Sequence, residues 1–449
     1  MTPEGIGLLM LALMLVAILI GFPTAFTLMS LGVFFGFLGM AQGGGNGFIV
    51  FDLVVLRTWF IMQNDVLVAI PLFLFMGYVV ERAGVLDDLF KSIALLMGRV
   101  PGSIGVATLL TGTLFATATG IVGASVTLLG LLSLPQMMRR GYSTTFATGI
   151  IVAAGTLGIL IPPSVLLILY GFIAGVSVPR LYAAAFIPGF LLSALYVGYI
   201  VIRSARDPKV APPTPIEETR APAREVFALF VKGLLPILSL ILFVLGAIFF
   251  GVATPSEGAA IGALGGLALA AFHRRLSFTM VKESVFLTVR TASIVGWLLV
   301  GSSIFAAVFA RLGSARVVGD FLLGLGLDPI AFVFMVQVII FLLGWPLEWT
   351  EIVIIFIPLF LPVLLTLKVD LVWFGVLSAV NMQTAFLSPP VAMSAYYLKN
   401  VAPKSVTLNQ IFIGMYPFIG IQLIALMLLY LYPDMATFLP DLVYGESTR

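Results

Sequence analysis

Residues 103–138 read SIGVATLLTGTLFATATGIVGASVTLLGLLSLPQMM, an apolar stretch whose middle is interrupted by small and hydroxyl-bearing residues. A membrane-spanning helix needs about 20 apolar residues, so this stretch is too long for one span. Irregular backbone at membrane depth occurs only where protein or a watery cavity satisfies it. We therefore interpret the stretch as a re-entrant helical hairpin whose tip is ATATGIVGAS, residues 116–125. Residues 330–366, interrupted by GWPLEWTE at 344–351, predict a second hairpin.

The amino-acid composition places both hairpins in an all-α polytopic membrane protein. The chain has 449 residues, of which 61% are hydrophobic and 10% are charged, whereas soluble domains carry roughly 25% charged residues. Cysteine is absent, and His273 is the single histidine. These counts exclude a disulfide framework, a zinc cluster and a cysteine nucleophile. We expect no catalytic residue, no cofactor and no nucleic-acid partner.

Apolar runs predict further membrane helices on both sides of the hairpins. They lie near residues 5–20, 23–40, 66–80, 144–173, 182–203, 227–250, 255–272, 288–310, 372–398 and 410–432. Two of these runs contain a double proline, which removes backbone donors and breaks a helix. Each of the two predicted broken helices, 144–173 and 372–398, follows a hairpin.

The chain divides into two similar halves around a linker rich in proline and charge. The prolines of LSLP and LIPPSV in the first half recur, at the same spacing, in LFLP and LSPPV of the second half. The first half is predicted to contain N-terminal scaffold helices in 1–65 and a first repeat in 66–203, with the hairpin 103–138 and the broken helix 144–173. A cytoplasmic linker in 204–226 follows. The second half is predicted to contain central scaffold helices in 227–287, a second repeat in 288–398 with the hairpin 330–366 and the broken helix 372–398, and a C-terminal helix and tail in 399–449.

The distribution of lysine and arginine orients the chain. When both stretches are treated as hairpins, most of the 23 Lys and Arg residues lie on the cytoplasmic side and both termini lie outside, as the positive-inside rule requires. The two hairpins then open to opposite sides of the membrane, so the repeats are inverted. Inverted repeats with broken helices are typical of secondary transporters. A channel is an alternative, but proline-broken repeats favour alternating access.

The broken helices and hairpin tips supply oxygen atoms that suit Na⁺. A double proline leaves carbonyl groups without helical partners, and the positive ends of half-helices attract a carboxylate substrate. We predict two pseudo-symmetric Na⁺ sites, each between a tip and a broken helix, with substrate between them and no other metal. The candidate Na⁺ ligands are Thr117, Thr119, Gly120, Ser125, Gly155, Thr156, Gly158, Glu348, Thr350, Asn381 and Thr384. The candidate residues of the substrate path are Gly123, Pro162, Pro163, Gln383, Ser388, Pro389 and Pro390.

Simpler interpretations of these residues stay open. Glycine, serine and threonine also allow close helix packing in lipid, so the threonines can be structural. Glu348 and Glu351 can line the substrate path, since carboxylates inside membranes are usually functional, or can lie at an aqueous rim. Asn381 and Gln383 are stronger candidates, because burying a carboxamide without partners costs several kcal/mol.

Residues 120–171, GIVGASVTLLGLLSLPQMMRRGYSTTFATGIIVAAGTLGILIPPSVLLILYG, resemble the DctM-like large permease of tripartite ATP-independent periplasmic (TRAP) transporters. Residues 251–263, GVATPSEGAAIGA, and 357–391, IPLFLPVLLTLKVDLVWFGVLSAVNMQTAFLSPPV, extend the resemblance over nearly the whole chain. The resemblance implies an elevator-type secondary transporter of the inner membrane, driven by a Na⁺ gradient, with both termini in the periplasm. It also implies two partners, a small four-helix membrane subunit and a periplasmic substrate-binding protein.

Such a protein would import an organic acid. Residues 344–362, GWPLEWTEIVIIFIPLFLP, resemble the branch linked to C4-dicarboxylates, keto acids or aromatic acids rather than to sialic acid. A stand-alone ion-coupled carboxylate carrier or antiporter of the same superfamily is the first alternative. An intramembrane enzyme is the second, but it would need a Ser/His pair, paired aspartates or metal ligands at depth. His273 lies in a basic loop and Asp87-Asp88 on an amphipathic segment, which disfavours an enzyme.

Overall fold

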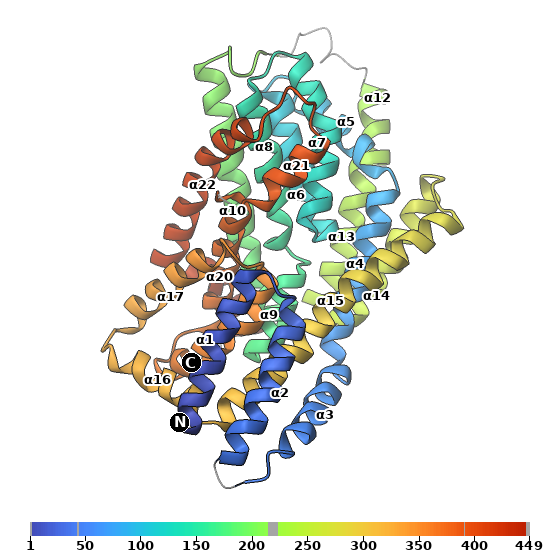
Figure 1. Ribbon diagram of the computed structural model, residues 1–449. Helices are drawn as coiled ribbons and strands as arrows, with labels where there is room; N and C mark the ends of the chain where they lie inside the picture. Colours follow the sequence, from blue (N-terminus) through green and yellow to red (C-terminus); the bar gives the residue numbers. More distant parts are fainter. Residues whose placement is uncertain (1, 43–44, 214–222, 390, 446–449) are drawn as a thin grey trace.

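The computed structural model describes residues 2–42, 45–213, 223–389 and 391–445. Every regular element in this part of the chain is a helix (Figure 1). Eight of these helices are long and apolar enough to cross a membrane, or up to ten if each of two bent pairs is one span. The prediction of an all-α polytopic membrane protein is therefore confirmed.

The chain starts with α1 (Pro3–Ile20), α2 (Thr24–Gln42) and α3 (Ile49–Met62). The hydroxyl of Thr2 accepts a hydrogen bond from the N–H of Gly5 and caps α1, and proline at the first helical position loses only a donor that has no helical partner. Gly21 ends α1 at a φ of 96°, a left-handed conformation that glycine adopts without strain. α4 (Asp65–Arg82) is bent by 57° from α3 and leads into α5 (Val85–Leu96).

Two helices joined by a tight turn, α6 (Ser103–Thr119) and α7 (Val122–Arg139), form the first hairpin. A Cβ atom on Gly112 would lie 2.8 Å from Cδ1 of Leu129, which is at a matching distance from the turn, so the two helices run back along each other. The first broken helix consists of α8 (Thr144–Thr156), the 3-10 turn η1 (Leu157–Ile159) and α9 (Val165–Ala174). α10 (Val178–Arg206) follows it.

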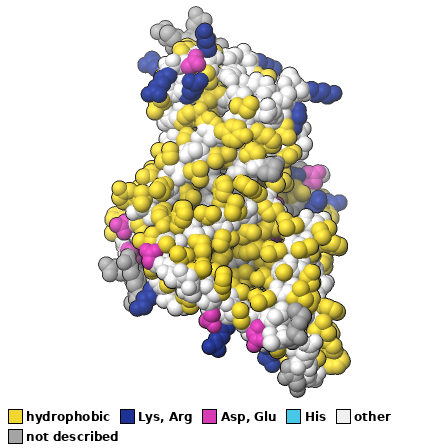
Figure 2. Space-filling view, turned by 60° about the vertical axis from the view of Figure 1, so that its left-hand side comes forward, with side chains coloured by type: hydrophobic (Ala, Val, Ile, Leu, Met, Phe, Trp, Pro, Cys, Tyr) yellow, Lys and Arg dark blue, Asp and Glu magenta, His cyan; other side chains and the backbone are white. Residues whose placement is uncertain are grey.

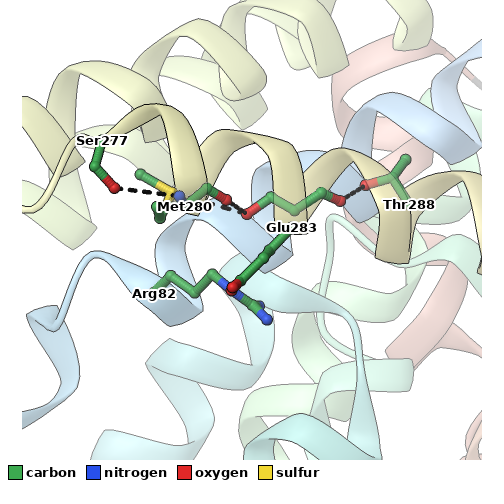
Figure 3. Close-up of polar contacts among 6 residues, drawn as sticks. Arg82, Ser277, Met280, Glu283 and Thr288 are labelled. Atoms are coloured by element: carbon green, nitrogen blue, oxygen red, sulfur yellow. Dashed lines mark hydrogen bonds and ion pairs between the residues drawn. The ribbon is translucent and has the colours of Figure 1, made fainter.

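The centre of the chain contains α12 (Ala223–Leu229), the π-helical turn η2 (Phe230–Leu234), α13 (Leu235–Phe249), α14 (Pro255–Phe272) and α15 (Phe278–Arg311). α14 packs along α4, and α15 packs along α2 and α4. Figure 3 shows the polar end of the α4–α15 contact, where Nε of Arg82 lies 3.3 Å from Oε2 of Glu283 and Ser277 caps α15 at Met280. These contacts join helices that lie about half the chain length apart in the sequence.

The second half begins with α16 (Ser314–Gly324) and α17 (Pro329–Leu343), followed by α18 (Trp349–Glu351), the π-helical turn η3 (Ile352–Phe356) and α19 (Ile357–Thr366). α17 contacts α19, so α17 and the segment α18–η3–α19 correspond to the predicted second hairpin, with residues 344–348 at its tip. The second broken helix consists of α20 (Leu371–Leu387) and α21 (Met393–Val401). The last described helices are α22 (Leu408–Leu431) and α23 (Asp434–Tyr444).

A close backbone crossing ties α22 to the first broken helix. A Cβ atom on Gly414 of α22 would lie 2.0 Å from the carbonyl oxygen of Thr145, and one on Gly149 of α8 would lie 2.1 Å from the carbonyl oxygen of Gly414. Only glycine permits helices to approach so closely. Because α22 also packs on α20, this crossing links the two broken helices.

The distribution of charged and hydrophobic side chains on the surface changes along the long axis of the molecule. In Figure 1, α1 begins in the lower part, while the α7–α8 connection and the residues that flank the linker lie at the top. Lys and Arg side chains gather most densely at that upper end in Figure 2, and hydrophobic side chains cover the middle. Phe243 is 72% exposed and Leu264 is 69% exposed. A surface of this kind suits lipid rather than water.

Candidate functional site

The tip of the first hairpin is closed by backbone and hydroxyl contacts. Gly120 has a φ of 64°, and its N–H donates to a carbonyl of the last turn of α6 at 2.7 Å. The hydroxyls of Thr119 and Ser125, on either side of the turn, lie 3.2 Å apart. Thr117 donates its hydroxyl hydrogen to a carbonyl of the previous turn at 2.6 Å. Because a hydroxyl that donates keeps its lone pairs, each of these side chains can still bind a cation.

The first broken helix leaves regular geometry between η1 and α9, and its polar groups there are buried. Thr156 donates its hydroxyl hydrogen to the carbonyl of Ala153 at 2.9 Å. Ser164 donates to the carbonyl of Ile159 and so bridges the break next to the double proline. Thr156 and Ser164 are both 0% exposed. Oxygen atoms at this depth need a partner from the protein, an ordered water or an ion.

The first tip and the first break pack directly against each other. A Cβ atom on Gly158 would lie 2.7 Å from the carbonyl oxygen of Ala116, and one on Gly155 would lie 2.3 Å from Cγ2 of Val126. These contacts require glycine, because there is no room for a side chain. The structure thus brings together the first-half candidates Thr117, Thr119, Gly120, Ser125, Gly155, Thr156, Gly158, Pro162 and Pro163.

The tip of the second hairpin carries two carboxylates. Glu348 and Glu351 form a capping box at the start of α18, in which the N–H of Glu348 donates to Oε2 of Glu351 at 3.1 Å. Thr350 donates its hydroxyl hydrogen to Oε2 of Glu348 over a long 3.5 Å. At the other end of the tip, a Cβ atom on Gly344 would lie 2.7 Å from Cβ of Ala385 in α20. The second tip therefore rests on the second broken helix.

The second broken helix leaves helical geometry after α20. Ser388 is extended, with a φ of −90° and a ψ of 122°. Thr384 donates its hydroxyl hydrogen to the carbonyl of Asn381 at 2.6 Å. Ser388 is 5% exposed, and its hydroxyl has no hydrogen-bond partner among the described residues. Pro389 lies at the break, whereas Pro390 lies outside the described residues.

Asn381 and Gln383 point to different neighbours of α20. Nδ2 of Asn381 donates to the backbone carbonyl and to Oε1 of Gln337 in α17, at 2.7 and 2.9 Å. Oε1 of Gln383 accepts from Nε2 of Gln422 in α22 at 3.1 Å. Oδ1 of Asn381 is buried and has no hydrogen-bond partner in the described part of the chain. Asn381 thus keeps an oxygen that can bind a cation, while Gln383 joins α20 to α22.

Tyr397 of α21 packs against the first tip. Its ring carbons lie 3.2–3.4 Å from the position of a Cβ atom on Gly123, at the start of α7. Sequence reasoning missed Tyr397, because nothing distinguishes it on an amphipathic helix. It also missed Gln337 and Gln422, although a carboxamide inside an apolar helix is a detectable signal.

The sequence of the chain matches the model of a known transporter family. Residues 11–435 match the family described as "Tripartite ATP-independent periplasmic transporter, DctM component". The chain belongs to this family. The prediction of a DctM-like TRAP large permease is confirmed, and the family works with a small membrane subunit and a substrate-binding protein.

Other TRAP large permeases resemble the chain over most of its length. The C4-dicarboxylate TRAP transporter large permease protein DctM of Pseudomonas aeruginosa is 29% identical over 384 residues, covering 84% of this chain and 87% of that protein. The sialic acid TRAP transporter large permease protein SiaM of Vibrio cholerae is 27% identical over 387 residues, covering 86% of this chain and 88% of that protein. Both are named transporter permeases rather than enzymes.

A solved structure shares the fold of this TRAP permease. The YdaH transporter of Alcanivorax borkumensis superposes with a TM-score of 0.61 and 17% sequence identity, covering 86% of this chain and 88% of that chain. The two proteins therefore share a fold although few of their residues are identical.

The contact between Tyr397 and the first tip gives a testable expectation. We expect Tyr397→Ala to lower the uptake rate of a reconstituted TRAP system about fivefold to tenfold, since removing a half-buried ring forfeits about 1 kcal/mol of apolar contact. Tyr397→Phe keeps the ring on Gly123 and should stay within about twofold of the unmodified protein. Uptake of labelled substrate into proteoliposomes measures both. Equal losses in the two variants would show that the hydroxyl, and not the ring, matters.

Proposed function

We propose that this chain is the large membrane subunit of a Na⁺-driven, binding-protein-dependent TRAP transporter that imports an organic acid by an elevator mechanism. The observation that carries the proposal is the packing of each hairpin tip against a broken helix. At these two places the backbone leaves helical geometry in a buried setting. Such places hold ions and substrates in secondary transporters.

The chemistry of the buried oxygens in these two regions supports Na⁺ as the coupling ion. The first region offers the hydroxyls of Thr119, Ser125 and Thr156 beside freed carbonyls. The second offers Oδ1 of Asn381 and the hydroxyl of Ser388, neither of which has a partner among the described residues. Carbonyl, hydroxyl and carboxamide oxygens are hard ligands that bind Na⁺ without proton release. Two Na⁺ balance the charge of a dicarboxylate, and each further Na⁺ adds one net charge, whose movement through 100 mV is worth about 2.3 kcal/mol toward accumulation.

An organic acid is the substrate class that fits the helix ends. α7 and α9 start at the first tip and the first break, and α21 starts after the second break. The N-terminal end of a helix carries a partial positive charge and attracts a carboxylate. The relatives are named for C4-dicarboxylates and sialic acid, which both carry carboxylates. We infer a dicarboxylate, a keto acid or a similar carboxylate for this chain.

The partners and the orientation follow from the same proposal. A small four-helix membrane subunit would support the scaffold helices, and a periplasmic substrate-binding protein would deliver the acid. With both termini in the periplasm, the basic upper end of Figure 2 would face the cytoplasm, as the positive-inside rule requires. The elevator step would carry both hairpins and both broken helices past the remaining helices, together with α10 and α22, which pack on the moving elements.

The test is uptake of labelled organic acids into proteoliposomes that contain this chain and its small subunit. An inward Na⁺ gradient is applied with and without the cognate binding protein, and a K⁺ gradient serves as the control. We expect accumulation only when both Na⁺ and the binding protein are present. Uptake without the binding protein would instead establish a stand-alone carrier. Uptake that does not depend on the Na⁺ gradient would overturn the proposed coupling of transport to Na⁺.

A further inference from the structure

One polar contact joins the second hairpin to the N-terminal helices. The hydroxyl of Thr24, at the start of α2, donates to Oε1 of Glu351. Oε2 of the same carboxylate accepts from the N–H of Glu348 at 3.1 Å. Glu351 therefore shapes the hairpin tip and touches α2 at the same time. Among the described residues, this is the sole side-chain hydrogen bond between the second hairpin and α1, α2 or α15.

A cavity lies beside this contact. It has a volume of about 230 Å³ and separates the second arm of the hairpin, at Ile355 and Pro358, from Leu28 of α2 and from Ala306 and Ala310 of α15. Atoms that face a void lose their dispersion contacts on that side. Packing between the hairpin and these two helices is therefore incomplete here, and the Thr24–Glu351 hydrogen bond is the directional contact that fixes the tip against α2.

The other face of α15 is packed tightly. A Cβ atom on Gly301 would lie 2.4 Å from the carbonyl oxygen of Ala25, and one on Gly32 would lie 3.3 Å from Cα of Phe305. α2 and α15 thus form one close-packed unit without room for sliding. The weak boundary in this region lies between that unit and the second hairpin.

We propose that the Thr24–Glu351 contact is a latch that holds the tip of the second hairpin against α2 and that opens and closes in each transport cycle. Glu351 is then a positioning residue that acts through the hairpin. This inference rests on the elevator mechanism of the proposed function. The contact breaks when the hairpin slides along the face of α15 that borders the cavity. Ala306 and Ala310 line this face together with the rings of Phe305 and Phe309, and the hairpin has fewer packing contacts to lose there.

A thiol bridge tests the latch directly, because the chain contains no cysteine of its own. In the variant Thr24→Cys/Glu351→Cys, Hg²⁺ would link the two thiolates and keep the contact closed. We expect Hg²⁺ to lower Na⁺-driven uptake at least tenfold and an excess of 2-mercaptoethanol to restore it. The unmodified chain has no thiol, so Hg²⁺ should leave its uptake unchanged.

The matched control bridges two elements that move together in the proposal. The hydroxyls of Thr113 in α6 and Ser193 in α10 lie 3.0 Å apart in a buried contact. In the variant Thr113→Cys/Ser193→Cys, we expect Hg²⁺ to change uptake by less than twofold. Loss of labelling by a maleimide measures bridge formation in both pairs, independently of transport.

The outcomes separate the latch from the proposed function. If the Thr24–Glu351 pair is bridged while uptake continues, or if its thiols cannot be bridged, the latch is wrong although transport stands. If the unmodified chain shows no Na⁺-driven uptake, the proposed function fails, whatever the bridge shows.

A second pair of variants avoids changing the carboxylate. Thr24→Val keeps the shape of the side chain and removes the hydroxyl, whereas Thr24→Ser keeps the hydroxyl. We expect Thr24→Val to change kcat for uptake at least threefold with KM within twofold, and Thr24→Ser to match the unmodified chain. A purely structural role would lower the amount of folded protein and leave kcat per transporter unchanged, which would overturn the latch.

Discussion

Gly414→Ala is expected to destabilise the protein by about 3 kcal/mol or more, at the upper end of what overpacking costs in a well-packed interior. The added Cβ atom would lie 2.0 Å from the carbonyl oxygen of Thr145 and 3.0 Å from the amide nitrogen of Gly149. Both obstacles are backbone atoms of α8, so no side-chain rotation relieves them. We expect the melting temperature in detergent, measured by loss of the monodisperse size-exclusion peak, to fall by at least about 5 °C.

The matched control lies on the same helix. A Cβ atom on Gly420 of α22 would meet no atom within 4 Å. Alanine in a helix is favoured over glycine by about 1 kcal/mol, so Gly420→Ala should melt at the same temperature as the unmodified chain or slightly higher. If the two alanine variants melted alike, the close crossing of α8 and α22 would be wrong.

Thr156→Ala and Asn381→Ala are each expected to weaken the Na⁺ dependence of uptake. Each removes one oxygen from a buried tip-and-break region. A lost hydrogen-bonding or ligating partner in a buried site costs about 1–3 kcal/mol, so the Na⁺ concentration for half-maximal uptake should rise about fivefold to 150-fold. Uptake at varied external Na⁺, with saturating substrate and binding protein, measures this concentration.

A neighbouring threonine provides the control for this experiment. Thr148 lies two turns before Thr156 in α8, is 0% exposed and donates its hydroxyl hydrogen to the carbonyl of Thr144 at 2.9 Å. It is far from the break, so Thr148→Ala should leave the Na⁺ dependence unchanged. If Thr156→Ala and Asn381→Ala both kept the Na⁺ dependence of the unmodified chain, the assignment of the two Na⁺ sites would be refuted.

The elements most visible in the sequence are those with local chemical signals. Gly120 marks the turn between α6 and α7 because it adopts a positive φ, and the double prolines mark breaks because they remove donors. The sequence does not indicate where α15 begins. The sequence predicts a run near 288–310, whereas the helix begins at Phe278, since Lys282 and Glu283 lie in its first turns and make them polar.

The partners across the site depend on tertiary packing and could not be predicted. The sequence predicts Gln383 in the substrate path, because it is a carboxamide near a break, whereas in the structure its Oε1 accepts from Gln422 in a helix about 40 residues away. Tyr397 reaches Gly123 only because α21 packs on α7. The sequence provides the types of ligand at each break, but the direction of each side chain follows from how α20, α21 and α22 are placed.

The two carboxamides of α20 have a consequence for how this protein can be altered. Asn381 is bound to α17 and Gln383 is bound to α22, so α20 is held from two directions and cannot turn about its own axis alone. A substitution at residue 381 therefore also removes a partner of α17, and one at residue 383 removes a partner of α22. Protein engineers who vary α20 should change Gln337 or Gln422 together with it, because a single change leaves a buried carboxamide of a neighbouring helix without its partner.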